Sequence, residues 1–485
     1  MNTTLPIKVL DLSQWKDTMD ISDPHYHYVI TGTNRQCGCI NFLNEDASGE
    51  KVYYVTVRNC VWEAQLWHSA LGFIVRNGHG TLRAYLEVDG ESSMTGSNFP
   101  GIDVNGSHVT LLAAGKGAKL NLGSYINPEG LRIINGGKVD LLPGTDAIEM
   151  KVGEETFTDF NAFLSAASQR KPVTLGLTSV PRKRIMILVN KTFENGGVVD
   201  GVNWALKGND FMALSNIDIQ YYCIQRDLDW KGISSSNSEV KYNGLIEFLK
   251  GKPVPDYIFS VSTSESTYEG QGGATDDSKA ERSANGCVYV GGQYFMADCR
   301  EINKGDKHYG TSKLDIGSPE TENTRFYPLQ KGAEKVLGEL GKLTSVISEA
   351  LKAQPGVPSF QSEWGNLYFC NEKNSCIGVV NVTNYEQYPI ADGCAYGLFY
   401  KEMAKGVNFG TPIGIETTHG VVRMAAEKAY GGDVPPVIFV SPITDRFVRF
   451  DRDVTSTGDK QNYACSRNGG IAIAHMMKHL DGKGA

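Results

Sequence analysis

The chain has 485 residues, 21% of them charged, and a formal net charge of −8. Its length exceeds the size at which a single hydrophobic core usually stops growing, so more than one domain is expected. The acidic balance, without a basic stripe, excludes broad binding to nucleic acid, and no apolar run of about 18 residues predicts a membrane-spanning helix.

Residues 1–170 are predicted to form a β-rich domain. Short β-branched or aromatic runs lie at 52–57, 71–75, 82–88, 109–112, 119–122, 131–134, 138–142 and 147–152. From about residue 100 onward these runs recur at a spacing of roughly ten residues, and glycine-containing turns separate them. This rhythm is typical of a sandwich, a barrel or a short solenoid, and the three alternatives stay open.

The pattern changes after residue 170 to alternating strands and helices. The continuous apolar run 185–189 is typical of a strand covered on both faces, and a further strand is predicted at 257–261. Asn195-Gly196-Gly197 indicates a turn, with a helix predicted at 203–214. The sequence therefore predicts a layered α/β domain, whose first part is 171–325 and whose second part is 326–485.

A long amphipathic helix is predicted at 330–353 in the second part. Val336, Leu340 and Ile347 recur at a spacing of three to four residues, and Pro355 ends the pattern. Internal glycines weaken this helix in isolation, so we expect it to lie against other structure.

Ten cysteines are too few for a disulfide scaffold, so reduced and buried thiols are the default expectation. A particle that is assembled in a cytoplasm can be oxidised after its release, and disulfides would then link its subunits. Candidates for inter-subunit or loop disulfides are Cys37, Cys39, Cys370, Cys376 and Cys465.

No complete metal or cofactor motif is present, and neither is predicted. His475 and His479 share a helix face, but a zinc peptidase would need Glu where Met476 stands. Cys37 and Cys39 are too closely spaced for a usual zinc knuckle.

The order of strands and helices resembles that of SGNH hydrolases, with 185–189 as the first strand and 468–480 as the final helix. The motifs depart from the family, because Asn190-Lys191-Thr192 replaces Gly-Asp-Ser and the segment 262–265 replaces Gly-x-Asn-Asp. A nucleophile without its base and oxyanion donors has little catalytic power. This resemblance implies an α/β hydrolase that acts on esters or glycans, or a degenerate relative of one that serves as a scaffold.

The β-rich opening, the short turns and the 10% aromatic content resemble the organisation of tailed-bacteriophage tail proteins, including sheath-like, baseplate and tailspike subunits. This resemblance implies a non-enzymatic assembly subunit of a large oligomer. It would lie in the virion, with copies of itself and other virion proteins as partners. Because residues 1–6 lack the features of a signal peptide, assembly is expected in the host cytoplasm.

The extended segments 1–28 and 442–468 are predicted to be arms that add strands to neighbouring subunits. Two other classes stay open beside the assembly protein. They are the hydrolase and a monomeric carbohydrate-binding module.

Overall fold

The structure is a computed structural model that describes residues 1–46, 48–65, 67–76, 80–180, 182–228, 238–266, 286–298, 325–354, 367–370, 374–380, 399, 403–406, 409–446 and 458–482. The chain forms two compact units, one of Met1 and Thr3–Arg182 and one of Asn2 and Lys183–Ala485. It is therefore a multi-domain α+β protein, with a β-rich unit followed by an α/β unit. The division falls later than the expected residue 170, because the strand Val173–Ser179 pairs with strands of the first unit.

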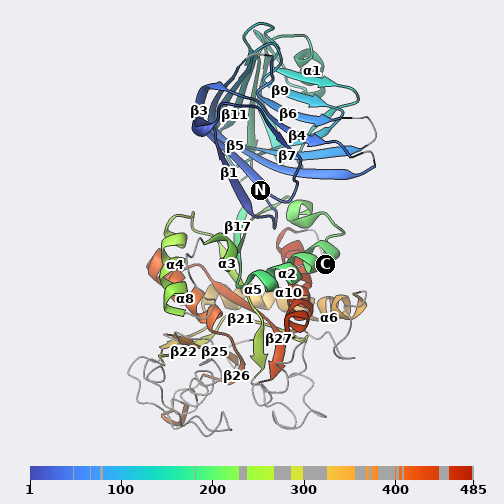
Figure 1. The fold of residues 1–485 in the computed structure, drawn as a ribbon. Helices are drawn as coiled ribbons and strands as arrows, with labels where there is room; N and C mark the ends of the chain where they lie inside the picture. The colour runs from blue at the N-terminus through green and yellow to red at the C-terminus, as the bar shows by residue number, and fades with distance from the viewer. Residues whose placement is uncertain are drawn as a thin grey trace. The chain divides into compact units, whose positions relative to one another are not determined.

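The first unit consists almost entirely of strands. They are β1 (Ile7–Asp11), β2 (Met19–Ile21), β3 (His27–Cys37), β4 (Ile40–Asn44), β5 (Glu50–Ala64), β6 (Leu71–Val75), β7 (Thr81–Asp89), β8 (Glu91–Gly96), β9 (Ile102–Asn105), β10 (His108–Ala113), β11 (Ala118–Ser124), β12 (Leu131–Ile134), β13 (Lys138–Leu141), β14 (Thr145–Val152), β15 (Glu155–Thr156) and β16 (Val173–Ser179). Strands β1, β3, β5, β7, β10 and β13 pair in parallel, and so do β2, β4, β6, β9 and β12 (Figure 1). Of the three architectures expected from the sequence, this unit has the solenoid, and we call it the solenoid unit.

Columns of stacked apolar side chains fill the interior of the solenoid. One column consists of four buried residues that are register partners on successive strands: Ile40, Leu71, Ile102 and Leu131. A second column consists of Tyr28, Val55, Leu86 and Leu111. Since each turn of the chain stacks only on its neighbours, the interior is a continuous core that no single turn could form alone.

The far end of the solenoid is closed by antiparallel structure. Strand β16 runs antiparallel to β11 and pairs on its other side with β14, and α1 (Phe160–Ala167) packs on β14. Phe163 of α1 is fully buried. The last parallel strand of this face is therefore not left as an open edge, which would invite pairing with another chain.

The α/β unit is built on a mixed sheet with helices on both faces (Figure 1). Its strands are β17 (Lys183–Val189), β18 (Ile217–Cys223), β19 (Tyr257–Val261), β20 (Ser264–Ser266), β21 (Val288–Gly291), β22 (Tyr294–Asp298), β23 (Arg325–Tyr327), β24 (Leu367–Phe369), β25 (Asn374–Val380), β26 (Thr411–Ile415) and β27 (Val437–Arg446). Its helices are α2 (Thr192–Ala205), α3 (Ile224–Asp227), α4 (Ser238–Lys250), α5 (Lys331–Leu340), α6 (Thr344–Ala353), α8 (Thr417–Tyr430) and α10 (Gly458–Leu480).

Alternate side chains of β17 enter two separate cores, as a strand covered on both faces requires. Ile185 and Ile187 join the core formed with α2, α5, α6 and α10, whereas Met186 and Leu188 join the core formed with α4 and α8. The continuous apolar run at 185–189 is thus a strand buried between the two helix layers of a three-layer unit.

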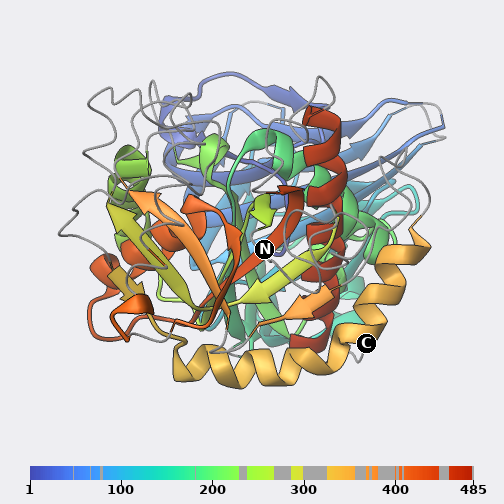
Figure 2. The same cartoon turned by 90° about the horizontal axis from the view of Figure 1, so that it is seen from below.

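The helix expected at 330–353 is present in two parts, α5 and α6, joined by the 3-10 turn Gly341–Leu343 (Figure 2). Val336, Leu340 and Ile347 are buried, as the amphipathic pattern predicted. The turn expected at 195–197 is instead the first half of α2. In the described part of the chain, no helix has both the length and the apolar character needed to cross a bilayer.

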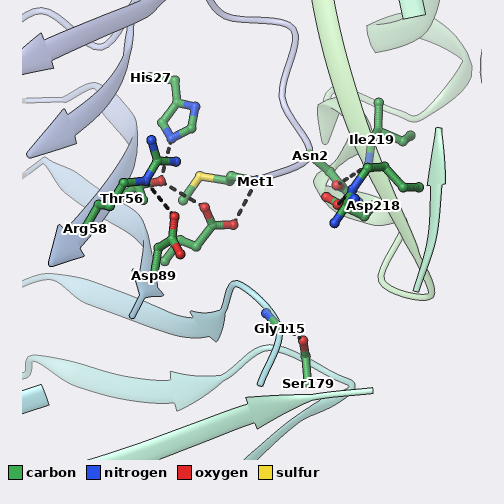
Figure 3. Close-up of polar contacts among 12 residues, drawn as sticks. Met1, Asn2, His27, Thr56, Arg58, Asp89, Gly115, Ser179, Asp218 and Ile219 are labelled. Atoms are coloured by element: carbon green, nitrogen blue, oxygen red, sulfur yellow. Dashed lines mark hydrogen bonds and ion pairs between the residues drawn. The ribbon is translucent and has the colours of Figure 1, made fainter. Parts of the chain in front are cut away.

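The segment 1–28 is not a free arm. Strand β1 pairs with β3 and β2 pairs with β4, and Leu10, Leu12 and Ile21 lie in the core. The Asn2 side chain bonds to the backbone beside and within β18, donating to Leu214 O at 2.7 Å and accepting from Ile219 N at 2.8 Å (Figure 3). In the segment 442–468, β27 continues to Arg446 and α10 begins at Gly458, and 447–457 lies outside the described residues.

Candidate functional site at the carboxyl edge of the α/β sheet

The strand order of the α/β unit reverses between β17 and β19. Strand β17 comes first in the chain, β18 lies on one side of it, and β19 and β27 follow on the other side, all in parallel. Open α/β sheets bind ligands outside the carboxyl ends of their strands at such a reversal, because the connecting helices lie on opposite faces and leave a crevice. Asn190 follows β17 at this edge, and Ser262 and Thr263 follow β19.

A chain of buried hydrogen bonds joins these strand ends. Asn190 Nδ2 donates to Ser262 Oγ at 3.1 Å. Lys241 Nζ, from α4, donates to Asn190 Oδ1 at 2.8 Å and to Thr418 Oγ1, from α8, at 2.9 Å. All four side chains are buried. The reversal point is therefore lined by polar groups from four separate elements.

Lys241 is the unusual member of this network. Burial removes water from its ammonium group and lowers its pKa to about 8, although the nearby Glu416 and Glu194 carboxylates favour the charged form. An ammonium group has three donors, and among the described residues both of its hydrogen-bond acceptors are neutral. A buried cation without a carboxylate partner among the described residues, at a sheet edge where ligands bind, is a marker of a functional site.

Glu194 has a structural position beside this network. It lies in the first turn of α2, where its Oε2 accepts from Lys191 N at 2.9 Å in the manner of a capping box. Its Oε1 accepts from Thr263 N at 2.9 Å, Thr263 Oγ1 at 2.5 Å and Ser262 Oγ at 3.2 Å. Burial raises the pKa of Glu194, although the hydrogen bonds from Thr263 act to lower it. Glu194 therefore fixes the end of β19 to α2 and has little capacity left for a ligand.

Glu416 lies at the same edge and has a carboxylate oxygen to which no described residue bonds. It follows β26 and caps α8, with Oε1 accepting from Thr418 N at 2.8 Å. No other described residue bonds to its carboxylate, and the side chain is only partly buried. Its charge favours the ionised form of Lys241, so a donor and an acceptor of opposite charge lie near each other.

His419 forms a second buried network next to the first. Its Nδ1 lies 2.9 Å from Ser260 Oγ and its Nε2 lies 2.9 Å from Ser441 Oγ. Burial lowers its pKa to about 4, so the ring is neutral, with one nitrogen donating and the other accepting. Ser441 thus contacts the ring nitrogen on which an Asp carboxylate would lie in a Ser-His-Asp triad.

Sequence reasoning identified only part of this site. Asn190 and Ser262 were noted as departures from a hydrolase motif, and the structure brings both to the reversal point. Lys241 and Glu416 were not identified, because Lys241 stands in an ordinary helical segment and Glu416 stands between a strand and a helix, with no motif around either.

In the described part of the chain, no disulfide involves the five cysteines that were expected to form one: Cys37, Cys39, Cys370, Cys376 and Cys465. All five are buried, and burial raises the pKa of Cys37 to about 11. A buried, protonated thiol cannot reach or attack a thiol of another chain without local opening. We therefore do not propose inter-subunit disulfides.

Among the described residues, no group of three or more His, Cys, Asp or Glu side chains is arranged to hold a metal ion. His475 and His479 lie on α10, and burial lowers the pKa of His475.

The solenoid unit contains its own buried polar column (Figure 3). Thr56 Oγ1 donates to Glu87 Oε1 at 3.0 Å and lies 2.7 Å from His27 Nε2, and the Met1 ammonium lies 2.8 Å from Glu87 Oε2. Burial opposes the charge of Glu87, but the Met1 ammonium and His27 keep its pKa below its usual value. These groups satisfy one another across neighbouring strands, as buried polar residues in a core must.

Comparisons with known proteins assign no family. No protein-family model and no curated protein matches the chain. Among solved structures, it is similar to the 5'-methylthioadenosine/S-adenosylhomocysteine nucleosidase of Neisseria meningitidis, with 8% identity and a TM-score of 0.31, covering 61% of this chain and 99% of that one. It is also similar to a uridine phosphorylase of Phytophthora capsici (11%, TM-score 0.36, 60% and 88%) and one of Schistosoma mansoni (11%, 0.33, 62% and 87%). At these values the likeness carries neither a family nor an activity.

Proposed function

We propose that the α/β unit binds a small ligand that carries hydroxyl groups, such as a sugar or a nucleoside, at the carboxyl ends of β17 and β19. The proposal rests on four polar side chains that lie together where the order of strands reverses. They are Lys241, Asn190, Ser262 and Glu416. The class of ligand follows from the groups that are present.

A hydroxyl group both donates and accepts, and the site offers a partner for each role. The Lys241 ammonium has a donor that no described residue uses, and Glu416 has a carboxylate oxygen that no described residue occupies. Glu194 already accepts four hydrogen bonds and keeps Ser262 and Thr263 in place. Lys241 and Glu416 are therefore the binding residues, and Glu194 is a positioning residue.

Lys241→Met is expected to weaken ligand binding tenfold or more, because a hydrogen bond from a charged donor contributes about 1.5–3 kcal/mol. Isothermal titration calorimetry with ribose, adenosine and uridine measures the affinity, and the rise in unfolding temperature with ligand concentration gives an independent value. The matched control is Lys250→Met on the same helix, since Lys250 is exposed and pairs with Glu247 on the helix surface. Equal affinities of the Lys241→Met variant and the unchanged protein would contradict the proposal.

Self-assembly is a second candidate function, and the edge strand β1 favours it. Strand β1 pairs with β3, and among the described residues its other edge pairs with no strand. Ile7 and Val9 on this strand are 48% and 60% exposed. An exposed apolar edge is a template for strand addition by another copy of the chain, as an assembly subunit requires. The virion location and the other virion proteins stay predictions from the resemblance to phage tail proteins.

Replacing Val9 by Lys is expected to abolish self-association, because a charge on an edge strand blocks pairing with a second edge. Sedimentation velocity of the unchanged protein and the variant across a concentration series checks this. Ile148→Lys is the control, since Ile148 is exposed on β14, away from the β1 edge. If the unchanged protein is monomeric at every concentration, self-assembly is ruled out as its function.

A further inference from the structure

Ser264, the first residue of β20, has a buried hydroxyl group without a hydrogen bond. Its side chain is 2% exposed, and no described residue bonds to its Oγ. A hydroxyl that loses water on folding and gains no partner destabilises the folded chain, so buried polar groups nearly always have a partner. The position of Ser264 in the fold indicates what its partner is.

Ser264 lies beside Glu416, a residue of the proposed ligand site. Strand β20 runs antiparallel to β26, with Glu265 opposite Ile415. This register, continued by one residue, sets Ser264 opposite Glu416, whose backbone is still extended. Opposite residues of an antiparallel pair project from the same face of a sheet, with Cβ atoms about 4.5–5.5 Å apart. The Ser264 hydroxyl and the Glu416 carboxylate are therefore neighbours.

Ser264 and Glu416 do not bond to each other. One oxygen of Glu416 accepts from Thr418 N, and neither the other oxygen nor Ser264 Oγ has a partner in the described part of the chain. The sheet is also irregular at this point, because Ser264 pairs with Ile443 and the next residue pairs with Asp445, two positions further along β27. Irregularities of this kind redirect side chains and are common beside active sites.

Lys241 supplies a third hydrogen-bonding group. Its Nζ donates to Thr418 Oγ1 at 2.9 Å, while Glu416 Oε1 accepts from Thr418 N at 2.8 Å. Glu416 is thus connected to Lys241 through the two polar groups of one residue, and to Ser264 through the strand register. The three side chains offer an ammonium hydrogen, a carboxylate oxygen and a hydroxyl that no described residue uses.

We infer, resting on the ligand site proposed above, that its ligand carries two hydroxyl groups on neighbouring carbon atoms, as ribose does, and that Ser264 determines this specificity. One hydroxyl accepts from Lys241 and donates to Glu416, and the second bonds to Ser264 Oγ. A ligand that lacks the second hydroxyl leaves Ser264 unpaired, and sites built to bond a hydroxyl discriminate against analogues without it for this reason.

Titration calorimetry with the full-length chain tests the inference. It compares ribose with 2-deoxyribose, uridine with 2'-deoxyuridine, and adenosine with its 2'-deoxy and 3'-deoxy analogues. The unchanged protein is expected to bind the compounds with both hydroxyls about tenfold more tightly than a deoxy analogue. The bond to Ser264 is stronger than average, because Ser264 already lost its water on folding and only the ligand hydroxyl gives up water on binding.

Ser264→Ala is expected to remove this preference. The affinity for the compounds with both hydroxyls falls to that of the weaker deoxy analogue, whose own affinity does not change. Without ligand, the unfolding temperature stays the same or rises, because the variant loses an unpaired hydroxyl. Ser441→Ala is the matched control, since Ser441 is an equally buried serine whose Oγ lies 2.9 Å from His419 Nε2. It is expected to lower the unfolding temperature and to keep the preference.

The outcomes separate this inference from the proposed function. Equal affinity of the unchanged protein for the compounds with both hydroxyls and for all deoxy analogues overturns the inference and leaves the ligand site in place. A preference that persists in Ser264→Ala overturns the role of Ser264, and so does an unfolding temperature lowered as much as in Ser441→Ala. If none of the compounds binds, the proposed function fails and the inference fails with it.

Discussion

Replacing Gly201 by Ala is expected to lower the free energy of unfolding of the α/β unit by about 3 kcal/mol or more. A Cβ at Gly201 would lie 2.1 Å from Arg467 O and 2.9 Å from Ile471 N, both in the backbone of α10. The obstacle is a helix backbone and not a flexible side chain, so α2 and α10 must move apart. Urea unfolding, followed by pulse proteolysis of the α/β unit, measures the loss.

Gly338→Ala is the matched control, because it makes the same change in a helix that has space for it. A Cβ at Gly338 in α5 would have no atom within 4 Å. The variant is expected to gain about 0.5–1 kcal/mol, since alanine restricts the unfolded chain and favours the helix. If both variants change the free energy of unfolding equally, Gly201 is not required for the close approach of α2 and α10.

The same glycines explain why helix α2 was not predicted from the sequence. Asn195-Gly196-Gly197 has the composition of a turn, and the structure places it inside a helix. A Cβ at Gly197 would lie 2.3 Å from Tyr463 O, and one at Gly470 would lie 2.1 Å from Val198 O. Glycine here serves the contact between two helices and not a turn. Local propensity could not reveal this, because the partner helix is more than 250 residues later in the chain.

The sequence predicted where the strands of the solenoid lie, but not which strands pair with one another. The runs at 109–112, 119–122 and 131–134 correspond to β10, β11 and β12, so the spacing of roughly ten residues located the strands. A sandwich, a barrel and a solenoid share such a spacing. What separates them is that Leu111 has Leu86 and Leu141 as parallel partners, and partners in register do not appear in the local pattern of one sequence.

Identification of the candidate site depended even more on knowledge of the fold. Asn190 and Ser262 attracted notice only because they replace motif residues, and Lys241 had no signal at all. Lys241 becomes notable when α4 places it against Asn190 and Thr418, residues that are 51 and 177 positions away. Because the chemistry of the site depends on the reversal between β17 and β19, the order of strands had to be known first.

Lowering the pH from 7.5 to 5 is expected to cost the α/β unit about 2 kcal/mol of stability through His419. Its pKa is lowered from 6.5 to about 4 by burial, so at pH 5 the folded ring is neutral while most unfolded chains carry the proton. The unfolded state then binds more protons, and stability falls as the pH falls from 6.5 toward 4. At 1.36 kcal/mol per pKa unit, the full loss below both values is about 3 kcal/mol.

His419→Gln isolates this contribution, because glutamine can bond to Ser260 and Ser441 but does not titrate. The charged groups that act on His419 are Glu416, which favours the protonated ring, and Lys241, which opposes it, and both remain in the variant. The pKa of Glu194 is raised, so Glu194 makes the folded state more stable as the pH falls, which is opposite to the effect of His419. The quantity to compare is therefore the difference in stability loss between the unchanged protein and the variant. Urea unfolding at pH 7.5, 6 and 5 is expected to give the variant a smaller loss on acidification. Parallel curves would mean that the His419 ring is not held neutral, and the two serines would then have to accept from an imidazolium in a closed core.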